Sequence, residues 1–584
     1  GEDEPTKTYL QQLSPIFDSD NKPTLKEIEE AFSVSRLSND FYKEYKDKFF
    51  KLVDHLEQNK DFMAESQRLG FENEPDKHNK FAVTFAKKTL GQIVFLYFVQ
   101  KKGWLGVPKD KNWGDGDKNY LIHSAKSFTG DNYFNDFLEP LFYNALNCKR
   151  ENDEYLGKKI PFLNGGLFHP IENYDWKNTN FIIPNDYWIN SEETGLLDVF
   201  SQYNFTVDES NPTEQEVAID PEMLGKIFES LLDTDDRSEK GAFYTPREIV
   251  HYMCEEALAS RLSTILGLDN DAIINYIRYG DALKETEFIK EFASDIDECV
   301  SNFTIVDPAV GSGAFLVGML NQIVKLRTNL LEFTDKKIDK YQLKLEAIQK
   351  SLYGVDVEYD AVEIAKLRLW LSLIVDQDTN GNCPNPLPNL NFHLRVGNSL
   401  VDKFEGIVLW NPRWKSTKAK EKKIIQPDLF NTDTLDSILH RLKEAKKEKL
   451  IQSIEREQIE LIRTTLVTKG AFDTYDNLSK MLEKKTKPFF VWELEFGEVF
   501  ENGGFDIAIA NPPYVQLQKN GGKLANELQD LGYKTFARTG DIYCIFYEKG
   551  VQILKEDGVL CFITSNKWMR AGYGEKTRKF LSEN

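Results

Sequence analysis

The chain has 584 residues, of which 41% are hydrophobic and 29% are charged, and its formal net charge at pH 7 is −21. Length and composition indicate a globular protein of several domains, and no apolar stretch reaches the ~18 residues of a transmembrane helix. The acidic balance opposes simple adhesion to nucleic acid, because phosphate contacts dominate such binding, although one basic face can coexist with an acidic body.

The six cysteines form no C-x-x-C pair, and several of them lie in apolar runs. We therefore expect free thiols in a reducing cytoplasm and no metal site. The first residue is Gly rather than Met, so we expect a piece of a longer or processed chain that carries no signal peptide.

Residues 1–235 are expected to form a mainly helical domain. Phe41, Tyr45 and Phe49 recur at helical spacing, so an adjacent Glu-x-Lys pair that resembles part of a nuclease site is better explained as a solvated helix face. A second helical pattern covers 81–105. We find no chemistry-bearing motif in this domain, which leaves scaffolding or clamping of DNA as its role.

The second domain is expected over 236–584, and its first motif is Tyr-Thr-Pro at 244–246, followed by a helix over 247–258. Thr245 is predicted to be the N-cap of that helix. Its hydroxyl and the nearby free amides could then bind a carboxylate, although a purely structural cap is the alternative.

A Gly-rich turn at 307–315 (DPAVGSGAF) joins a short apolar strand over 303–306 to a helix. Strand, Gly-rich turn and helix are the arrangement for nucleotide-like ligands, and Gly311 and Gly313 allow close approach of the backbone. Asp307 supplies a charge suited to a ligand ammonium group. Because neither G-x-G-x-x-G nor G-x-x-x-x-G-K is present, we favour a cationic ligand with an amino acid end, S-adenosylmethionine.

Two more strands are predicted over 352–356 and 392–396, the first followed by a helix over 361–373. Asp356 ends the first of these strands, where a carboxylate accepts both ribose hydroxyls of an adenosine. Asn398 follows the second strand and is placed to hydrogen-bond the adenine of the ligand.

The alternation of strands and helices is interrupted over about 402–490. Between residues 401 and 450 twelve Lys and Arg stand against eight Asp and Glu, with a basic cluster over 413–423. A solvated helical insertion is the favoured explanation, and an arm that contacts phosphates beside the site is the alternative.

The apolar run 505–510 predicts a buried strand that is ended by Asn-Pro-Pro-Tyr at 511–514, and a fifth strand follows at 558–564. The lone pair of an adenine N6 amine is delocalised, so the amine is a poor nucleophile. The Asn511 side-chain oxygen and the Pro512 carbonyl could each accept one N6 hydrogen and localise that lone pair. Tyr514 would stack on a base taken out of its duplex.

Four elements stand in a fixed order along the chain: Tyr-Thr-Pro at 244–246, the turn at 307–315, Asp356, and Asn-Pro-Pro-Tyr at 511–514. In this order the chain resembles the gamma-class N6-adenine DNA methyltransferases, and most of all the large Eco57I-type restriction–modification methylases, which include type IIG enzymes. The resemblance implies that Asn511, Pro512 and Tyr514 bind the target adenine. It also implies that S-adenosylmethionine is bound by nine residues: Tyr244, Thr245, Asp307, Ala309, Gly311, Gly313, Phe315, Asp356 and Asn398.

The resemblance further implies a doubly wound Rossmann-like α/β sheet after the helical domain, duplex DNA as partner, and a prokaryotic cytoplasmic enzyme without a membrane. Asn398 stands where the family more often has Asp, which weakens one contact only slightly. We expect two further strands and a target-recognition domain or subunit beyond residue 584. We also expect the chain alone to bind the cofactor weakly and to methylate nothing detectable.

Three alternatives remain open at this stage. A glutamine N5-methyltransferase that acts on protein shares the NPPY turn, but such enzymes are small and lack both the motif before the Gly turn and the basic insertion. Methylation of adenine in RNA is the second. The third is a non-catalytic DNA-binding subunit with a retained cofactor fold, against which the intact Asn511 and Tyr514 speak.

Overall fold

A computed structural model of the chain divides into two compact units. The first unit comprises Gly1–Asp233, Ile338–Gln349 and Glu363–Leu390, and the second comprises Thr234–Lys337, Lys350–Val362 and Asn391–Asn584. The structure describes residues 34–71, 78–163, 166–171, 174–203, 205, 245–280, 289–334, 336–404, 407–408, 459–460, 462–463, 466, 472–483 and 489–584.

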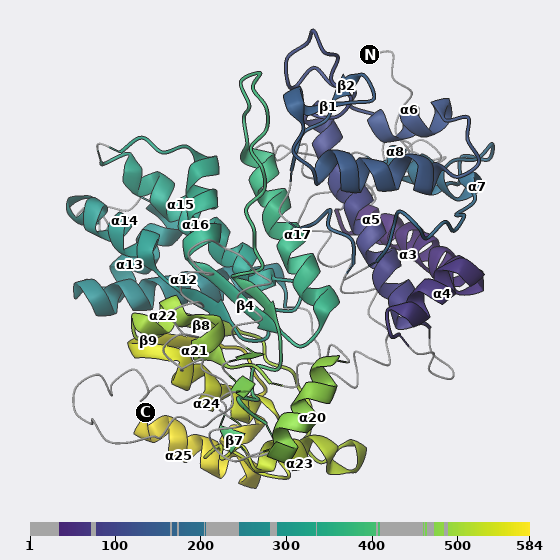
Figure 1. The fold of residues 1–584 in the computed structure, drawn as a ribbon. Helices are drawn as coiled ribbons and strands as arrows, with labels where there is room; N and C mark the ends of the chain where they lie inside the picture. Colours follow the sequence, from purple (N-terminus) through teal and green to yellow (C-terminus); the bar gives the residue numbers. More distant parts are fainter. Residues whose placement is uncertain are drawn as a thin grey trace, which may run out of the picture. The chain divides into compact units, whose positions relative to one another are not determined.

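Helices make up most of the described part of the first unit (Figure 1). Many of their buried side chains are aromatic. The predicted stripe is confirmed, since Phe41, Tyr45 and Phe49 are buried on α3. The elements are α3 Val34–Gln58, α4 Lys60–Arg68, α5 Lys80–Lys101, α6 Tyr120–Ser127, η1 Phe134–Leu138, η2 Leu141–Leu146, η3 Glu151–Asp153, β1 Glu154–Tyr155, β2 Lys158–Lys159, α7 Asn185–Trp188, α8 Leu196–Ser201, α16 Lys340–Lys350 and most of α17 Tyr359–Asp376.

Helix α5 is apolar on all sides because it lies inside the first unit. It is long and apolar enough to cross a membrane, but 83% of its most apolar window is buried. Within the described residues it is the one helix that meets this test, and its burial is that of a core helix.

A five-stranded parallel sheet organises the second unit, with the strands in the order β5-β4-β3-β8-β9 (Figure 1). All four pairings are parallel, and the register places Val306 opposite Tyr353 on one side and Ala508 on the other. The strands are β3 Ile305–Asp307, β4 Leu352–Asp356, β5 Leu394–Val396, β8 Phe505–Ala510 and β9 Leu554–Phe562; a separate hairpin pairs β6 Lys403–Phe404 with β7 Ile407–Val408.

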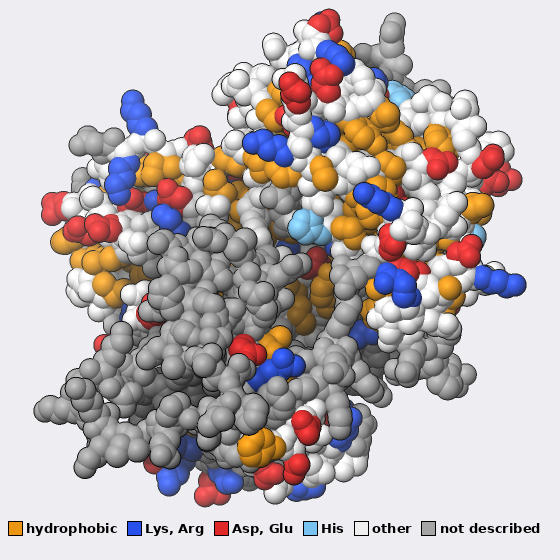
Figure 2. All heavy atoms as spheres, viewed as in Figure 1, with side chains coloured by type: hydrophobic (Ala, Val, Ile, Leu, Met, Phe, Trp, Pro, Cys, Tyr) orange, Lys and Arg blue, Asp and Glu red, His pale blue; other side chains and the backbone are white. Residues whose placement is uncertain are grey.

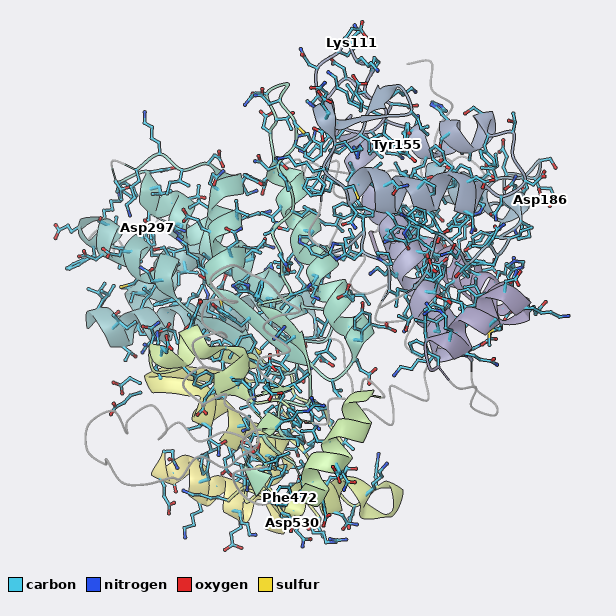
Figure 3. All side chains as sticks on the ribbon, in the orientation of Figure 1. Lys111, Tyr155, Asp186, Asp297, Phe472 and Asp530 are labelled. Carbon is cyan, nitrogen blue, oxygen red and sulfur yellow. The ribbon has the colours of Figure 1, made fainter. Side chains whose placement is uncertain are left out.

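Helices pack on both faces of this sheet. Helices α12 and α15 pack against each other and against its strands, and α24 packs on β8 and β9. Figure 3 labels Asp297 of α14, which accepts from Arg327 of α15 at 2.7 Å and so ties these two helices together. The helices are α12 Arg247–Leu266, α13 Asn270–Tyr279, α14 Ala293–Asn302, α15 Ala314–Leu331, α20 Phe472–Glu483, α21 Trp492–Glu495, α22 Gly497–Glu501, η7 Asn520–Gly522, α23 Lys523–Gln529, α24 Tyr543–Ile553, η8 Asn566–Met569, η9 Gly572–Gly574 and α25 Glu575–Glu583.

The two faces of the sheet differ in chemistry. Phe505 of β8 lies in an apolar cluster with Val306 and Trp492, among others. The next residue, Asp506, points to the opposite face, where it pairs with Arg261 of α12 at 2.7 Å. Aromatic packing on one face and a buried ion pair on the other therefore hold β8 between two helical layers.

The predicted fold class is confirmed: a mixed α/β unit with a parallel sheet accompanies a mainly helical one. Strand bounds differ by a few residues, since β3 includes Asp307 and β9 begins at Leu554 rather than at 558. Most of the predicted insertion at about 402–490, including the basic cluster over 413–423, lies outside the described residues. The first unit also takes up 338–349 and 363–390, which the boundary expected near 235 had placed in the second domain.

Candidate active site

The candidate site lies at the carboxyl ends of the central strands. Because β3 lies between β4 and β8 in a parallel sheet, the ends of these three strands meet at one edge. The chain runs outward from β3 through β4 to β5 and then returns to β8, so β3 and β8 flank the point where the strand order reverses. Open α/β sheets bind ligands at such a point, and it carries Asp307, Asp356 and Asn511.

Two carboxylates shape the Gly-rich turn. Asp307 Oδ1 accepts the Ala309 amide at 2.9 Å, and Asp356 Oδ2 accepts the Gly311 amide at 2.9 Å. Gly311 and Gly313 adopt positive φ of 50° and 81°, a region that favours glycine. A Cβ added at Gly311 would meet nothing within 4 Å, so the turn borders open space there.

Burial controls the charge of both carboxyl groups. Desolvation raises the pKa of Asp307 well above its usual range, against a lowering by the Ala309 amide, and the neighbouring Asp356 raises it further. Burial also raises the pKa of Asp356, while the amides of Glu358 and Gly311 counteract this. A cationic group at this edge would therefore relieve the cost of the Asp307 charge.

At the end of β8 the Asn-Pro-Pro-Tyr turn is held by side chains from two other elements. Asn511 Nδ2 donates to Thr245 Oγ1 at 3.0 Å. The Tyr514 hydroxyl donates to the Ile563 carbonyl at 3.2 Å, and its half-buried ring lies 5.6 Å from that of Tyr543. Pro512 is buried, so the turn is fixed through both its backbone and its side chains.

The prediction that Thr245 caps α12 is wrong. The helix begins at Arg247 with Pro246 as its N-cap, and no side chain caps it. Thr245 stands one residue earlier and is buried, with its hydroxyl oxygen turned to Asn511. Tyr244, the other candidate in this motif, lies outside the described residues.

The remaining predicted residues lie around the same edge. Asn398 Oδ1 accepts the Leu400 amide at 3.1 Å, which closes the turn after β5. Ala309 packs beside an apolar cluster that includes Leu400, and Phe315 is buried at the start of α15.

Sequence reasoning missed two neighbours of the site. Ser399 Oγ donates to the Pro308 carbonyl at 2.6 Å and so joins the turn after β5 to the Gly-rich turn. Val357 directly follows Asp356 and is 62% exposed, an apolar surface beside the polar turn. Val357 could have been predicted as a neighbour of the site only from its position directly after the acid that ends a strand. No feature of the sequence indicates Ser399.

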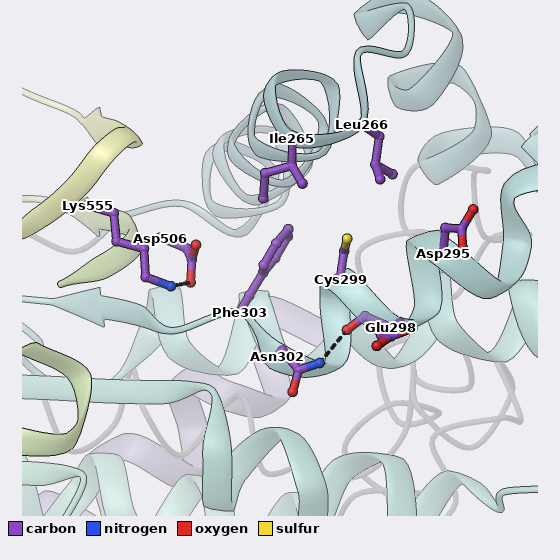
Figure 4. Close-up of a pocket in the computed structure, with 9 residues that line it drawn as sticks. All are labelled: Ile265, Leu266, Asp295, Glu298, Cys299, Asn302, Phe303, Asp506 and Lys555. Carbon is purple, nitrogen blue, oxygen red and sulfur yellow. Dashed lines mark hydrogen bonds and ion pairs between the residues drawn. The ribbon is translucent and has the colours of Figure 1, made fainter. Parts of the chain in front are cut away.

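A cavity of about 450 Å³ lies at the opposite edge of the sheet (Figure 4). It is lined by residues near the amino ends of the strands, such as Phe303, Asp506 and Lys555, and by Ile265 at the end of α12. Lys555 Nζ binds Asp506 Oδ2 at 2.7 Å within the lining of this cavity. Because none of the predicted site residues lines this cavity, it is separate from the candidate site.

Part of the chain matches the model of a known protein family. The model of the Eco57I restriction-modification methylase family matches residues 350–584. Residues 350–584 are therefore similar to that methylase family. It contains Asp356, Asn398 and the Asn-Pro-Pro-Tyr turn, whereas Asp307 and Thr245 precede it.

Relatives of the methylase segment extend the similarity upstream. The chain is 29% identical, over 96% of its length, to a protein of Methanocaldococcus jannaschii named as a candidate type II restriction enzyme and methyltransferase. It is 21% identical, over 64% of its length, to the adenine-specific methyltransferase PglX of Lacticaseibacillus casei. The chain spans 51% and 30% of these two relatives, about half of their length or less.

A solved structure shares the fold. The type IIL restriction-modification enzyme MmeI, determined in complex with DNA, superposes with a TM-score of 0.51 at 16% sequence identity. The superposition covers 93% of this chain and 53% of the MmeI chain. This agreement concerns the architecture, in which a parallel sheet accompanies a mainly helical unit.

Proposed function

We propose that the protein carrying this chain transfers a methyl group from S-adenosylmethionine to the N6 amine of adenine in duplex DNA. The observation that carries the proposal is the position of Asn511. It ends β8 beside the Gly-rich turn that ends β3, and its amide is held by Thr245. A methyl acceptor and a methyl donor would thus share one edge of the sheet.

The chemistry of the turn fits the cofactor. Asp307 suits the amino group of the ligand, and Asp356 retains lone pairs for ribose hydroxyls while it accepts two backbone amides. The open space at Gly311 and the exposed Val357 suit the body of an adenosine. When bound, S-adenosylmethionine supplies an electrophilic methyl group on a sulfonium.

The Asn-Pro-Pro-Tyr turn would prepare the nucleophile. The Asn511 side-chain oxygen and the Pro512 carbonyl would accept the two N6 hydrogens, which draws the nitrogen toward tetrahedral geometry and localises its lone pair. The Tyr514 ring, anchored through its hydroxyl to Ile563, would stack on the base. Positioning and acceptor dipoles then carry the rate without a general base of matched pKa. The proton that the methylated nitrogen must lose would pass to solvent after transfer.

Access to N6 inside a duplex requires that the adenine leave the base stack, so the proposal includes base flipping. The family match of residues 350–584 supports a role in a restriction–modification system. We propose that the protein acts in the prokaryotic cytoplasm. The adenine-specific name of one relative supports adenine over cytosine.

Tritiated methyl transfer tests the proposal. The protein that contains this chain is incubated with labelled S-adenosylmethionine and duplex DNA, RNA or protein, and the product is digested and identified. We expect N6-methyladenine in DNA, and cofactor binding by this chain in titration calorimetry. Label in protein alone, in RNA alone or in cytosine would reject the proposal, and cofactor binding without any transfer would favour a non-catalytic subunit.

A further inference from the structure

One hydrogen bond joins the two motifs that lie furthest apart in the chain. Asn511 Nδ2 donates to Thr245 Oγ1 at 3.0 Å, across a separation of 266 residues. Thr245 is 5% exposed, so water does not compete freely for this bond. The hydroxyl is the acceptor here, which means that its single hydrogen points away from Asn511.

The turn alone does not fix the Asn511 side chain. The two prolines restrain the backbone that follows, but the terminal torsion of an asparagine is broad and samples many orientations. Thr245 constrains that torsion from a second element. Arg261 anchors the helix that follows Thr245 to β8 through Asp506, so the two elements next to this bond are tied to each other.

We propose that Thr245 is a positioning residue for Asn511. Its hydroxyl oxygen accepts the hydrogen bond from Asn511 Nδ2. This holds the Asn511 side chain in the orientation in which its amide oxygen can accept a hydrogen from the substrate amine. This inference rests on the proposed function, since it assigns Thr245 to the methyl-accepting half of the site. It differs from the expectation that Thr245 serves the cofactor alone.

The test compares Thr245→Val, which keeps the shape and removes the hydroxyl, with Thr245→Ser, which restores it. In the protein that contains this chain we expect Thr245→Val to lower kcat at least about tenfold, the effect of losing the one hydrogen bond that orients the Asn511 amide, and Thr245→Ser to recover most of the rate. The Kd for S-adenosylmethionine should stay within about twofold, because the lost contact is to Asn511. A tenfold weaker cofactor Kd with kcat unchanged would overturn the inference.

A double-mutant cycle in thermal unfolding gives a second readout that does not need activity. Thr245→Val and Asn511→Ala each remove one end of the same bond, so the fall in Tm of the double variant should be smaller than the sum of the two single falls. Additive falls would overturn the inference. If the wild-type protein transfers no methyl group, the proposed function fails, while this cycle still decides the role of Thr245.

Discussion

At the scale of single residues, the proposed chemistry depends on the amide of Asn511. Asn511→Ala removes one of two acceptors for the N6 hydrogens, and loss of one such preorganised dipole costs on the order of 10²–10³ in rate. We expect methyl transfer to fall by about that factor while calorimetry gives an unchanged cofactor Kd. Equal losses in transfer and in cofactor affinity would place Asn511 in the cofactor site instead.

Two substitutions of Tyr514 separate the contribution of its ring to methyl transfer from that of its hydroxyl. Tyr514→Phe removes the bond to the Ile563 carbonyl but keeps the ring beside Tyr543. We expect a loss of only a few-fold in kcat/KM for Tyr514→Phe and a loss of about 10-fold or more for Tyr514→Ala, since base stacking is worth ~1–3 kcal/mol. If both variants lost the same activity, the hydroxyl rather than the ring would be the functional group.

Removal of the Asp307 charge should stabilise the fold and weaken cofactor binding. Burial raises its pKa, so in the folded protein its carboxyl favours the protonated form, and its contribution to stability is lost as pH rises through the folded-state pKa. Asp307→Asn keeps an oxygen for the Ala309 amide and removes the charge. We expect a higher Tm than wild type at pH 8, a smaller gain at pH 5, and weaker cofactor binding at both.

Scanning calorimetry at the two pH values, with cofactor titration beside it, checks this prediction. Asp269→Asn is a matched control, because Asp269 caps α13 through the Ala272 amide, away from the candidate site. A fall in Tm for Asp307→Asn that is the same at both pH values would contradict the assignment.

At the scale of elements, α12 is fixed to the sheet by a buried ion pair. Burial would raise the pKa of Asp506, but Lys555, the Thr304 amide and Arg261 together bring it below its usual range. Arg261→Met removes a cation that bonds Asp506 at 2.7 Å and leaves the carboxylate undercompensated. We expect a loss of about 3–5 kcal/mol in the free energy of unfolding at pH 7.

The stability lost in Arg261→Met should depend on pH, and the lowered pKa of Asp506 gives the direction. A carboxylate with a lowered folded-state pKa stabilises above its unfolded pKa, and this contribution is lost as pH falls through the folded-state value. Urea unfolding should therefore show a smaller difference between Arg261→Met and wild type at pH 3 than at pH 7. Lys51→Ala, which removes an exposed pair with Asp47 on α3, should cost less than about 1 kcal/mol.

Elements with strong local patterns could be predicted from the sequence. Short apolar runs predicted β4, which ends in an acid, and β8, which is followed by a Pro-Pro turn, with their observed bounds. A buried parallel strand needs little beyond its own residues. The start of β9 and the N-cap of α12 were predicted wrongly, since both depend on partners elsewhere in the fold. β9 begins at Leu554, which pairs with Phe505, and this pairing has no signature in the local sequence.

The contacts within the site were harder to predict. The sequence indicated which side chains meet at the carboxyl edge, because parallel strands bring their ends together. It did not indicate that Asp356 would accept the Gly311 amide or that Thr245 would accept Asn511. These bonds join residues that are 45 and 266 positions apart, and they depend on tertiary geometry that no local pattern records.

At the scale of the whole molecule, the net charge of −21 must be reconciled with a nucleic acid partner. Figure 2 shows acidic and basic side chains interspersed over the described surface of the first unit. The proposed affinity for DNA would therefore come from local groups rather than from the net charge. The basic cluster over 413–423 lies outside the described residues, so a solvated insertion stays the favoured prediction and a phosphate-contacting arm the alternative.

The central claim is that methyl donor and methyl acceptor share the carboxyl edge of the sheet. A crystal structure with sinefungin, a non-reactive analogue of S-adenosylmethionine, tests it most directly. We predict the amino acid end of the analogue beside Asp307, its ribose at Asp356, and its reactive end directed toward Asn511. Binding in the cavity lined by Phe303 and Lys555, or a reactive end turned away from Asn511, would contradict the account.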